Sequence, residues 1–375
     1  MHYSGMHPFE LRGDGVLLAT PTSADVDAIT EHCRDEEVRR WTTVPDPYHR
    51  SDAEEFVKLI DEAWADDKAL NWAVRNPEDR SVLGMVGLNL DGRGSGEIGF
   101  WMGREGRGRG LMTTAVRLVI DYAFAPEGLG LQRILWYAHV GNWASRRLVW
   151  RLGFAFEGTI RSHLAQRGER RDAWVATLMA GDPIRPKGSW LNVPTLTGTT
   201  VRLRRFTDSD ADACVEACTD PVSRHWLGGL PDPYTKDVAL GYIRSRENDH
   251  AAGTAIHWAA EQPGGSAAIG SFSLMNIGEG HAEVGYWVHP AVRGRGVATE
   301  AVGMIARHAL TPQSEGGLGL RRLSLARAEG NDASGAVAER AGFSEFGVAS
   351  SAERLGDGSW ADLHWYELLA DPRRA

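Results

Sequence analysis

Two stretches of the chain share one pattern. Residues 97–112 read EIGFWMGREGRGRGLM, and residues 283–298, which begin 186 positions later (283 minus 97), read EVGYWVHPAVRGRGVA. Apolar and polar residues alternate at the start of each stretch, which is typical of a half-buried strand. An arginine–glycine turn follows, and beyond it apolar residues recur at three- and four-residue spacing, which is typical of a helix. The pattern predicts a strand, a glycine turn and a helix, present twice.

The repeat extends well beyond these two stretches. The same spacing of 186 relates residues 46–48 to residues 232–234, and a spacing of 189 relates residues 153–154 to residues 342–343. Repeats that stack into solenoids have periods of about 20–50 residues. A period as long as this one indicates a duplicated domain.

The chain length fits two domains. It has 375 residues, whereas single hydrophobic cores stop growing near about 250–300 residues. Residues 185–197 contain two prolines and a glycine without helical or strand periodicity, which is typical of a linker. We therefore predict a first domain over residues 1–184, a linker over 185–197 and a second domain over 198–375.

Composition excludes several classes of protein. A net charge of -9 argues against a nucleic-acid surface, although it leaves room for a local basic groove. Residues 1–15 lack the apolar stretch of a signal peptide, and nothing approaches the roughly 20 apolar residues of a membrane span. The chain has three cysteines, Cys33, Cys214 and Cys218, and this odd number disfavours a disulfide framework. Cys214 and Cys218 lack the two further residues nearby that a metal site would need as ligands. We expect a cytoplasmic protein without nucleic-acid, membrane or metal partners.

Periodicity and turn residues predict a mixed order of helices and strands in the first half, with the second half parallel to it. The predicted helices cover residues 25–40, 52–65, 111–123 and 144–152, and the predicted strands cover 16–18, 71–74, 82–90, 97–102, 134–138 and 174–179. Such an order indicates an α/β or α+β fold, in which helices cover the faces of a central sheet.

The glycine turn has the composition of an anion-binding loop. Glycine permits positive φ and leaves backbone N–H groups accessible, the following helix begins with unpaired N–H donors, and arginine adds positive charge. We predict a pyrophosphate cradle in each half, formed by Arg107, Gly108, Arg109, Gly110, Leu111 and Met112, and by Arg293, Gly294, Arg295, Gly296, Val297 and Ala298.

Two common phosphate motifs do not fit this turn. A dinucleotide fingerprint would need a third glycine where Thr113 and Thr299 stand, and a Walker loop would need lysine where Arg109 stands. A merely flexible turn is the alternative. Its recurrence in the same strand–turn–helix context favours the cradle.

Both halves resemble the GNAT superfamily, in particular its ribosomal-protein N-terminal acetyltransferases of the RimJ/RimL type. The acetyl-coenzyme A signature of that superfamily, Arg/Gln-x-x-Gly-x-Gly/Ala, is complete at Arg293, Gly296 and Ala298, whereas Met112 departs from it in the first half. The family's Glu-x-Gly-aromatic-Trp strand also matches, at residues 97–101 and 283–287, and so does its Asn-x-x-Ser step, at residues 142–145 and 331–334. The resemblance covers nearly the whole chain and implies two tandem GNAT folds, each with a mixed, splayed central sheet flanked by helices.

The resemblance also implies acetyl-coenzyme A as cofactor, without a metal. Backbone N–H groups around Trp101 and Met102, and around Trp287 and Val288, are candidates for holding the thioester carbonyl and its developing oxyanion. Asn142 and Asn331 are candidates for binding the pantetheine amides. Alternatively, each caps the helix that follows it.

Acyl transfer needs a neutral amine and a stabilised leaving thiolate. Glu97 and Glu283 are candidate bases, with an exposed carboxylate or an arginine partner as the alternative. The resemblance nominates Ser145 and Ser334 as donors to the thiolate, although serine is also common at helix N-termini. No cysteine lies near these motifs, which favours direct transfer over an acyl-cysteine.

The acceptor remains open at this point. Its binding site is expected in the early helices, where residues 41–43 align with 225–227, with added aromatic surface from Trp64 and Trp72 unless these pack in the core. We predict transfer to a primary amine of a small molecule, a peptide or a protein N-terminus. The alternatives are one catalytic domain beside a scaffold or acyl-coenzyme A sensor, and a pure interaction module. The two domains could pair as an intramolecular pseudo-dimer, whether the intact chain is a monomer or a homodimer.

Overall fold

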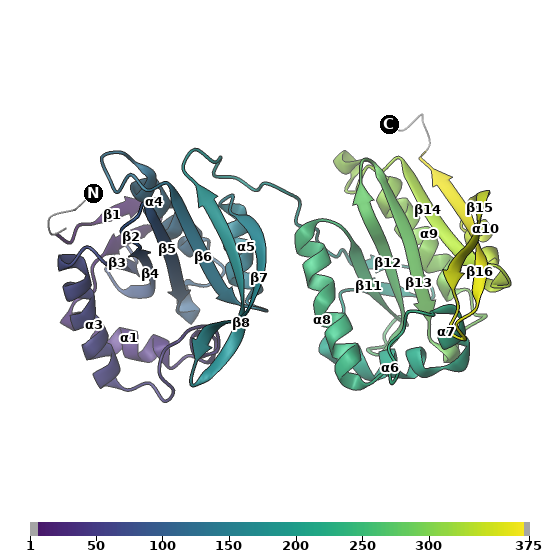
Figure 1. The fold of residues 1–375 in the computed structure, drawn as a ribbon, viewed down its shortest axis with the longest axis horizontal. Coiled ribbons are helices and arrows are strands. Elements are labelled where there is room, and N and C mark those ends of the chain that lie inside the picture. Colours follow the sequence, from purple (N-terminus) through teal and green to yellow (C-terminus); the bar gives the residue numbers. More distant parts are fainter. Residues whose placement is uncertain (1–6, 371–375) are drawn as a thin grey trace. The chain divides into compact units, whose positions relative to one another are not determined.

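The computed structural model describes residues 7–370, which form two compact units that divide between Lys187 and Gly188 (Figure 1). The chain ends assigned to the predicted domains, residues 1–6 and 371–375, lie outside this range. Part of the predicted linker is built into the second unit: the N–H of Leu191 donates to the carbonyl of His250 at 2.8 Å. Among residues 7–370, no helix has the length and apolar content that a bilayer span requires.

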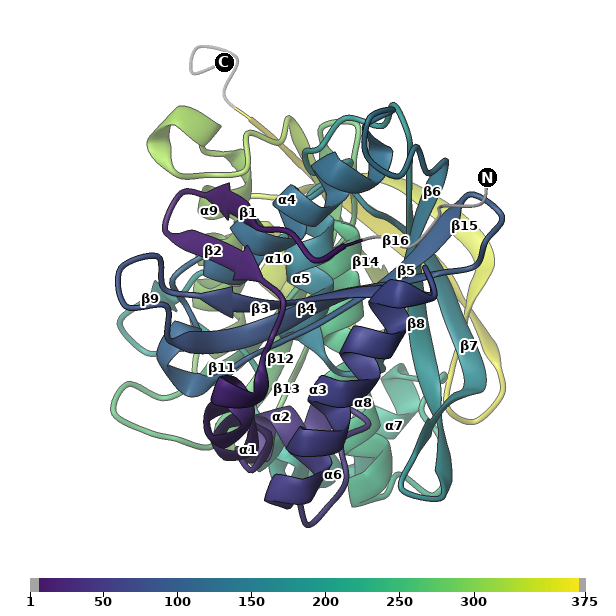
Figure 2. The ribbon, with the colours of Figure 1, turned by 90° about the vertical axis from the view of Figure 1, so that its left-hand side faces the viewer.

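The first unit is an eight-stranded sheet in the order β1-β2-β3-β4-β5-β6-β8-β7, in which β5 and β6 are parallel and all other neighbours antiparallel. Figure 2 shows α4 on one side of this sheet and α1 and α3 on the other. Its strands are β1 (Leu11–Gly13), β2 (Val16–Ala19), β3 (Ala69–Arg75), β4 (Val82–Leu90), β5 (Ser95–Met102), β6 (Arg133–His139), β7 (Ala155–Gln166) and β8 (Glu169–Met179). Its helices are α1 (Val26–Cys33), α2 (Glu36–Trp41), α3 (Arg50–Ala65), α4 (Leu111–Phe124) and α5 (Trp143–Arg151).

The second unit repeats this topology with the strand order β9-β10-β11-β12-β13-β14-β16-β15, and its parallel pair is β13 and β14. Its strands are β9 (Leu196–Thr197), β10 (Arg202–Arg204), β11 (Ile256–Glu261), β12 (Ala268–Gly278), β13 (His281–Val288), β14 (Arg322–Ala328), β15 (Ser344–Arg354) and β16 (Trp360–Leu369). Its helices are α6 (Ala211–Thr219), α7 (Pro221–Trp226), α8 (Lys236–Ala252), α9 (Val297–Leu310) and α10 (Asp332–Arg340).

In both units the parallel strands part halfway along their length. β5 pairs with β6 only from Ser95 to Ile98, although β4 continues to pair with β5 as far as Met102. β13 likewise pairs with β14 only as far as Val284, while β12 follows it to Val288. The separation confirms the predicted pair of mixed, splayed sheets, and it leaves the ends of β5 and β13 free of a neighbour on one side.

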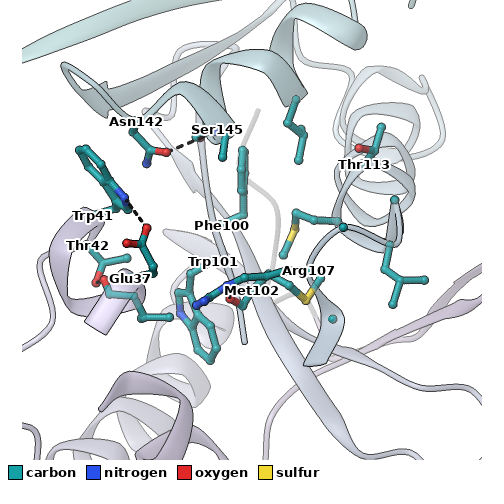
Figure 3. Close-up of a pocket in the computed structure, with 18 of the residues that line it drawn as sticks. Glu37, Trp41, Thr42, Phe100, Trp101, Met102, Arg107, Thr113, Asn142 and Ser145 are labelled. Carbon is teal, nitrogen blue, oxygen red and sulfur yellow. Dashed lines mark hydrogen bonds between the residues drawn. The ribbon is translucent and has the colours of Figure 1, made fainter. Parts of the chain in front are cut away.

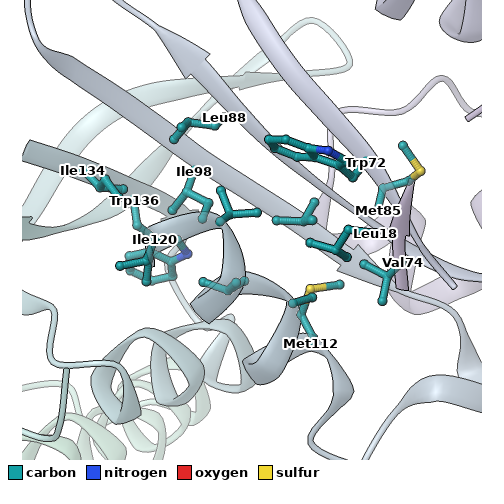
Figure 4. Packing of buried hydrophobic residues seen from close by; sticks show 14 of the residues in the cluster. Leu18, Trp72, Val74, Met85, Leu88, Ile98, Met112, Ile120, Ile134 and Trp136 are labelled. Carbon is teal, nitrogen blue, oxygen red and sulfur yellow. The ribbon is translucent and has the colours of Figure 1, made fainter. Parts of the chain in front are cut away.

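The core of the first unit lies between the sheet and α4, whose apolar face includes Met112 and Ile120 (Figure 4). Trp64 and Trp72 belong to this core with exposed fractions of 1% and 0%, and their rings meet edge to face at 5.2 Å. The suggestion that these two tryptophans add binding surface is therefore wrong. They are large apolar groups whose burial stabilises the fold.

The predicted helix over residues 25–40 is broken in two. α1 ends at Cys33, and Asp35 adopts extended angles (φ −61°, ψ 134°) while its Oδ1 accepts the N–H of Val38 at 3.3 Å. A short carboxylate at this position competes with the helical path by capping the next helix. As a result α2 starts in a new direction.

The two units differ in a buried ion pair. In the first unit Arg75 on β3 holds Asp25 with two hydrogen bonds of 2.7 and 2.8 Å, and both side chains are about one-tenth exposed or less. In the second unit the matching strand position is Glu261. There Arg204 from β10 binds both Asp210 and Glu261.

Candidate active site

A cavity of about 460 Å³ lies in the first unit at the end of β5, beyond the point where β5 pairs with β6 (Figure 3). Residues of α2, β5, the glycine turn, α4 and α5 line it. Of the site residues predicted from the sequence, the cavity is lined by Trp101, Met102, Arg107, Gly108, Gly110, Leu111, Met112, Asn142 and Ser145. Arg109 and Glu97 do not line it.

The glycine turns have the backbone that an anion cradle needs. Gly108 and Gly110 have φ of +75° and +79°, and Gly294 and Gly296 have φ of +73° and +78°. A Cβ added at any of these four positions would have no atom within 4 Å, so the backbone borders open space. α4 begins directly after the first turn, and the amides of a first helical turn have no partner within the helix. The residues therefore fit a diphosphate.

Arg107 holds the glycine turn in place in addition to giving it a positive charge. Its Nε donates to the carbonyl of Met102 at 2.9 Å, and its guanidinium pairs with Asp35, the cap of α2. Burial alone would raise the pKa of Asp35, but hydrogen bonds from Arg107 and from the backbone of Val38 outweigh it and hold the pKa low. The arginine thus joins the glycine turn to α2.

The second unit contains the same link. Arg293 donates to Asp220 at 2.7 Å and to the hydroxyl of Ser223 at 2.8 Å, and Asp220 caps α7. Arg109 and Arg295, also predicted to bind the cofactor, are exposed. Their part in the pyrophosphate cradle stays a prediction.

The two asparagines cap the helices that follow them. The side-chain oxygen of Asn142 accepts the N–H of Ser145 at 3.2 Å, and that of Asn331 accepts the N–H of Ser334 at 3.3 Å. The structure thus contains the capping contact named as the alternative in the sequence analysis. Asn142 also lines the cavity, so its amide can serve a ligand in addition.

The two serines have different hydroxyl partners. The indole N–H of Trp136 donates to Ser145 Oγ at 3.0 Å, whereas Ser334 Oγ shares a hydrogen bond of 3.0 Å with the phenol of Tyr286. Sequence reasoning missed both partners. The signal for the second was present, because Tyr286 stands where the first repeat has Phe100.

The two predicted bases lie on β5 and β13, four residues before Trp101 and Trp287 on the same strands. Glu97 is exposed on the strand face that it shares with Trp101, and partial desolvation raises its pKa while His163 acts in the opposite direction. Glu283 is half-buried, and its Oε2 accepts the side-chain amide of Asn276 at 3.3 Å. Residues four apart on a strand are separated by roughly 13 Å. Glu97 therefore lies beyond direct hydrogen-bonding distance of a group placed beside Trp101.

Helix α2 supplies a wall of the cavity that the motif analysis did not identify fully. Trp41 and Thr42 line it as expected for the early helices, and Trp41 Nε1 donates to Glu37 Oε2 at 3.0 Å (Figure 3). Glu37 itself was missed, although its position four residues before Trp41 on a short helix was a usable signal.

The wall that α2 contributes in the first unit differs from the equivalent part of the second unit. The ring of Trp41 lies 3.4 Å from a Cβ placed on Gly141, and the ring of Trp226 lies 3.6 Å from a Cβ placed on Gly330. Trp41 therefore corresponds to Trp226, which corrects the alignment by one residue. With this register the position of Glu37 is taken by Val222, which is 51% exposed.

None of the three cysteines is among the residues that line the cavity. Cys33, Cys214 and Cys218 are buried, and desolvation raises the pKa of Cys33 to about 11 and that of Cys214 to about 12. Thiols with such pKa values are protonated and weakly nucleophilic near neutral pH.

Comparison with known proteins gives consistent matches. A model of the acetyltransferase (GNAT) domain matches residues 16–155 and 200–344. The uncharacterized N-acetyltransferase p20 of Bacillus licheniformis is 27% identical over 157 residues, which cover 41% of this chain and 87% of that protein. The putative ribosomal N-acetyltransferase YdaF of Bacillus subtilis (strain 168) is 43% identical over 96 residues, 25% of this chain and 51% of the relative. A solved structure of a putative ribosomal-protein-serine acetyltransferase from Vibrio cholerae aligns with a TM-score of 0.42 at 21% identity, covering 46% of this chain and 97% of the other.

Proposed function

Because the chain belongs to the GNAT acetyltransferase family, we propose that each of its units transfers an acetyl group from acetyl-coenzyme A directly to a primary amine. The observation that carries the proposal is the glycine turn with two positive φ angles, present in both units beside a parted strand pair. In the first unit the turn lines a cavity that also contains an aromatic wall and a serine hydroxyl.

The residues that would hold the cofactor follow from these contacts. Backbone amides of the turns, residues 107–112 and 293–298, would bind the diphosphate, with Arg109 and Arg295 contributing charge. Backbone N–H groups near Trp101 and Trp287 would bind the thioester carbonyl, because these strand ends have lost one neighbour. When bound, acetyl-coenzyme A supplies the activated acetyl group as a thioester.

The protein's own groups would handle the protons. Glu97 and Glu283 would remove a proton from the acceptor amine through water, and the raised pKa of Glu97 makes it a stronger base than an ordinary glutamate. Ser145 and Ser334 would donate hydrogen bonds to the departing sulfur. The high pKa of Cys33, which is not among the residues that line the cavity, favours direct transfer over a covalent acyl-enzyme.

The acceptor is proposed as a class of amine. A carboxylate beside a tryptophan, Glu37 and Trp41, suits an ammonium group or a peptide N-terminus at the first unit. The similarity to a putative ribosomal N-acetyltransferase supports a peptide or protein N-terminus among the candidates. A small-molecule amine remains within the same class.

The proposal is tested by counting bound coenzyme A molecules per chain with native mass spectrometry. The wild-type chain should bind two. Gly110→Asp and Gly296→Asp place a carboxylate in the anion cradle, and each should reduce the count to one by weakening its own site more than about tenfold.

Matched asparagine variants separate charge from backbone strain. Asparagine tolerates positive φ better than most residues and has the shape of aspartate. Gly110→Asn and Gly296→Asn should therefore keep two bound molecules. A wild-type chain that binds no coenzyme A, or aspartate variants that still bind two, would contradict the proposal. A wild-type count of one would instead support the alternative of a single active domain.

A further inference from the structure

The hydroxyl partners of the two serines differ in chemistry, and this difference bears on the departure of the thiolate. The inference rests on the proposed acetyl transfer. Ser145 and Ser334 occupy equivalent helix positions, each with its backbone N–H bound to the capping asparagine. Their backbones are therefore held alike, and the difference lies in their hydroxyl groups.

In the first unit the partner is an indole. Trp136 is 1% exposed and its N–H can only donate, so Ser145 Oγ must accept this hydrogen bond. The hydroxyl proton of Ser145 is then free to point elsewhere, and Ser145 lines the cavity. An indole N–H does not ionise near neutral pH, and Trp136 cannot replace a proton that Ser145 gives up.

In the second unit the partner is a phenol. Tyr286 OH lies 3.0 Å from Ser334 Oγ, and its ring stacks on Phe272 with centroids 5.5 Å apart and planes 14° apart. Its strand position is that of Phe100, which lines the cavity of the first unit. The contact of Trp136 is absent there, because the matching position on β14 is Leu325. Desolvation raises the pKa of Tyr286, with Ser334 acting in the opposite direction, so the phenol is protonated near neutral pH.

We propose that Tyr286 is a positioning residue that orients Ser334 toward the leaving sulfur and replaces the proton that Ser334 donates. In the acyl transfer the C–S bond breaks, its electron pair leaves with sulfur, and a C–N bond forms. Ser334 gives its proton to the thiolate and takes one from Tyr286, and the phenolate regains a proton from water. The proton lost by the amine nitrogen passes to Glu283 or to water, so the total is conserved.

The proposal is tested in a chain whose first site is disabled by Gly110→Asp, so that coenzyme A reports on the second site. Coenzyme A and desulfo-coenzyme A are titrated by calorimetry into this chain with Tyr286 unchanged, and into its Tyr286→Phe and Ser334→Ala variants. The pKa of the bound thiol is followed by the ultraviolet absorbance of its thiolate. Both variants should raise that pKa by roughly one unit, a tenfold loss of thiolate stabilisation. Affinity for desulfo-coenzyme A should stay unchanged.

A kinetic measurement tests the proton relay itself. With a primary amine that supports thiol release by the wild-type chain, Tyr286→Phe should slow the second site by about 10²-fold and alter the alkaline part of its pH profile. The matched variant is Trp136→Phe in a Gly296→Asp chain, which should slow the first site by less than about tenfold, because the indole only orients Ser145.

The outcomes separate this inference from the proposed function. If the second site binds neither coenzyme A nor its desulfo form, the proposed function fails. If both bind and Tyr286→Phe weakens them equally, the tyrosine only packs against Phe272 and the inference is overturned. An unchanged thiol pKa in Tyr286→Phe overturns it as well.

Discussion

Glu97 and Glu283 occupy the same strand position in the two units but have neighbours of opposite kind. Desolvation raises the pKa of Glu97 while the nearby His163 acts in the opposite direction. Glu283 instead lies near a second carboxylate, Glu353, whose pKa is raised by desolvation and by the charge of Glu283. The two proposed bases therefore differ in their surroundings although the motif around them is the same.

Replacing Glu97 tests its role as a base. In a Gly296→Asp chain, thiol release by the first unit should fall as the pH drops through the raised pKa of Glu97, because only the carboxylate accepts a proton. Glu97→Gln should remove this acidic limb and lower the rate by about 10²–10⁴-fold. Glu283→Gln in the same chain changes a disabled site and should have no effect. Retention of the limb in Glu97→Gln would exclude Glu97 as the base.

At the scale of elements, the break between α1 and α2 is what brings α2 to the site. Asp35 caps α2 and also accepts a hydrogen bond from Arg107 of the glycine turn, so one carboxylate connects the glycine turn to the α2 wall of the cavity. The second unit repeats the connection with Asp220 and Arg293. A contact kept in both copies indicates that the position of the short helix depends on it.

Replacing Arg107 should increase the local opening of α2. Arg107→Gln should speed hydrogen exchange of residues 36–41 by more than about tenfold, because a partly buried charge-assisted hydrogen bond is lost. It should also raise KM for the acceptor amine more than Kd for coenzyme A. Arg109→Gln, two residues away and exposed, is the control and should leave the exchange unchanged. Equal exchange in both variants would refute the link.

These elements also show which parts of the fold could be predicted from the sequence alone. The strand of residues 82–90 and the helix that starts at Leu111 were predicted with correct starts, because periodicity and glycine are local signals. The cap of α2 by Asp35 is local, but the contact that joins Asp35 to Arg107 spans 72 residues, and the burial of Trp64 involves Trp72 across the core. Such long-range contacts leave no periodic trace in the sequence. β7 was not predicted as a strand, because most of its residues are exposed and it lacks the alternation of apolar and polar residues on which the prediction depends.

Within the site, the turn residues were predictable and their partners were not. Gly108 and Gly110 have the positive φ that their spacing suggested. The sequence also contained the Phe100 and Tyr286 difference, but only the fold brings the phenol to Ser334. The predicted bases remain predictions, since Glu97 does not line the cavity.

Across the whole molecule, the two units have the same topology but differ in the polarity of their interiors. Beneath α8 in the second unit, His257 is 2% exposed and its ring nitrogens contact Ser273 at 2.7 Å and Asp249 at 3.0 Å. In the first unit Asn71 stands at the position of His257, and Gly87 stands at the position of Ser273. Desolvation, assisted by the charge of Arg246, lowers the pKa of His257 to about 4.

This histidine predicts that acid destabilises one unit before the other. Its pKa is lower in the folded state than the ordinary 6.5, so the unfolded state binds the proton more tightly. The stability contribution is complete above pH 6.5 and is lost as the pH falls toward about 4. The protection of residues 256–261 against hydrogen exchange, corrected for the intrinsic exchange rate at each pH, should therefore fall over this range more than that of residues 69–75. His257→Asn, which copies the first unit, should flatten the difference. An equal loss of protection in both segments of the wild-type chain would refute the assignment.

The rearranged ion pair has a consequence for the history of the duplication. A chain that exchanged β3 for β11 would place Glu261 beside Asp25, two interior carboxylates without a guanidinium, and the reverse exchange would set Arg75 beside Arg204. An uncompensated interior charge costs several kcal/mol. Gene conversion between the two halves is thus penalised at this strand, which favours the independent divergence of the two copies.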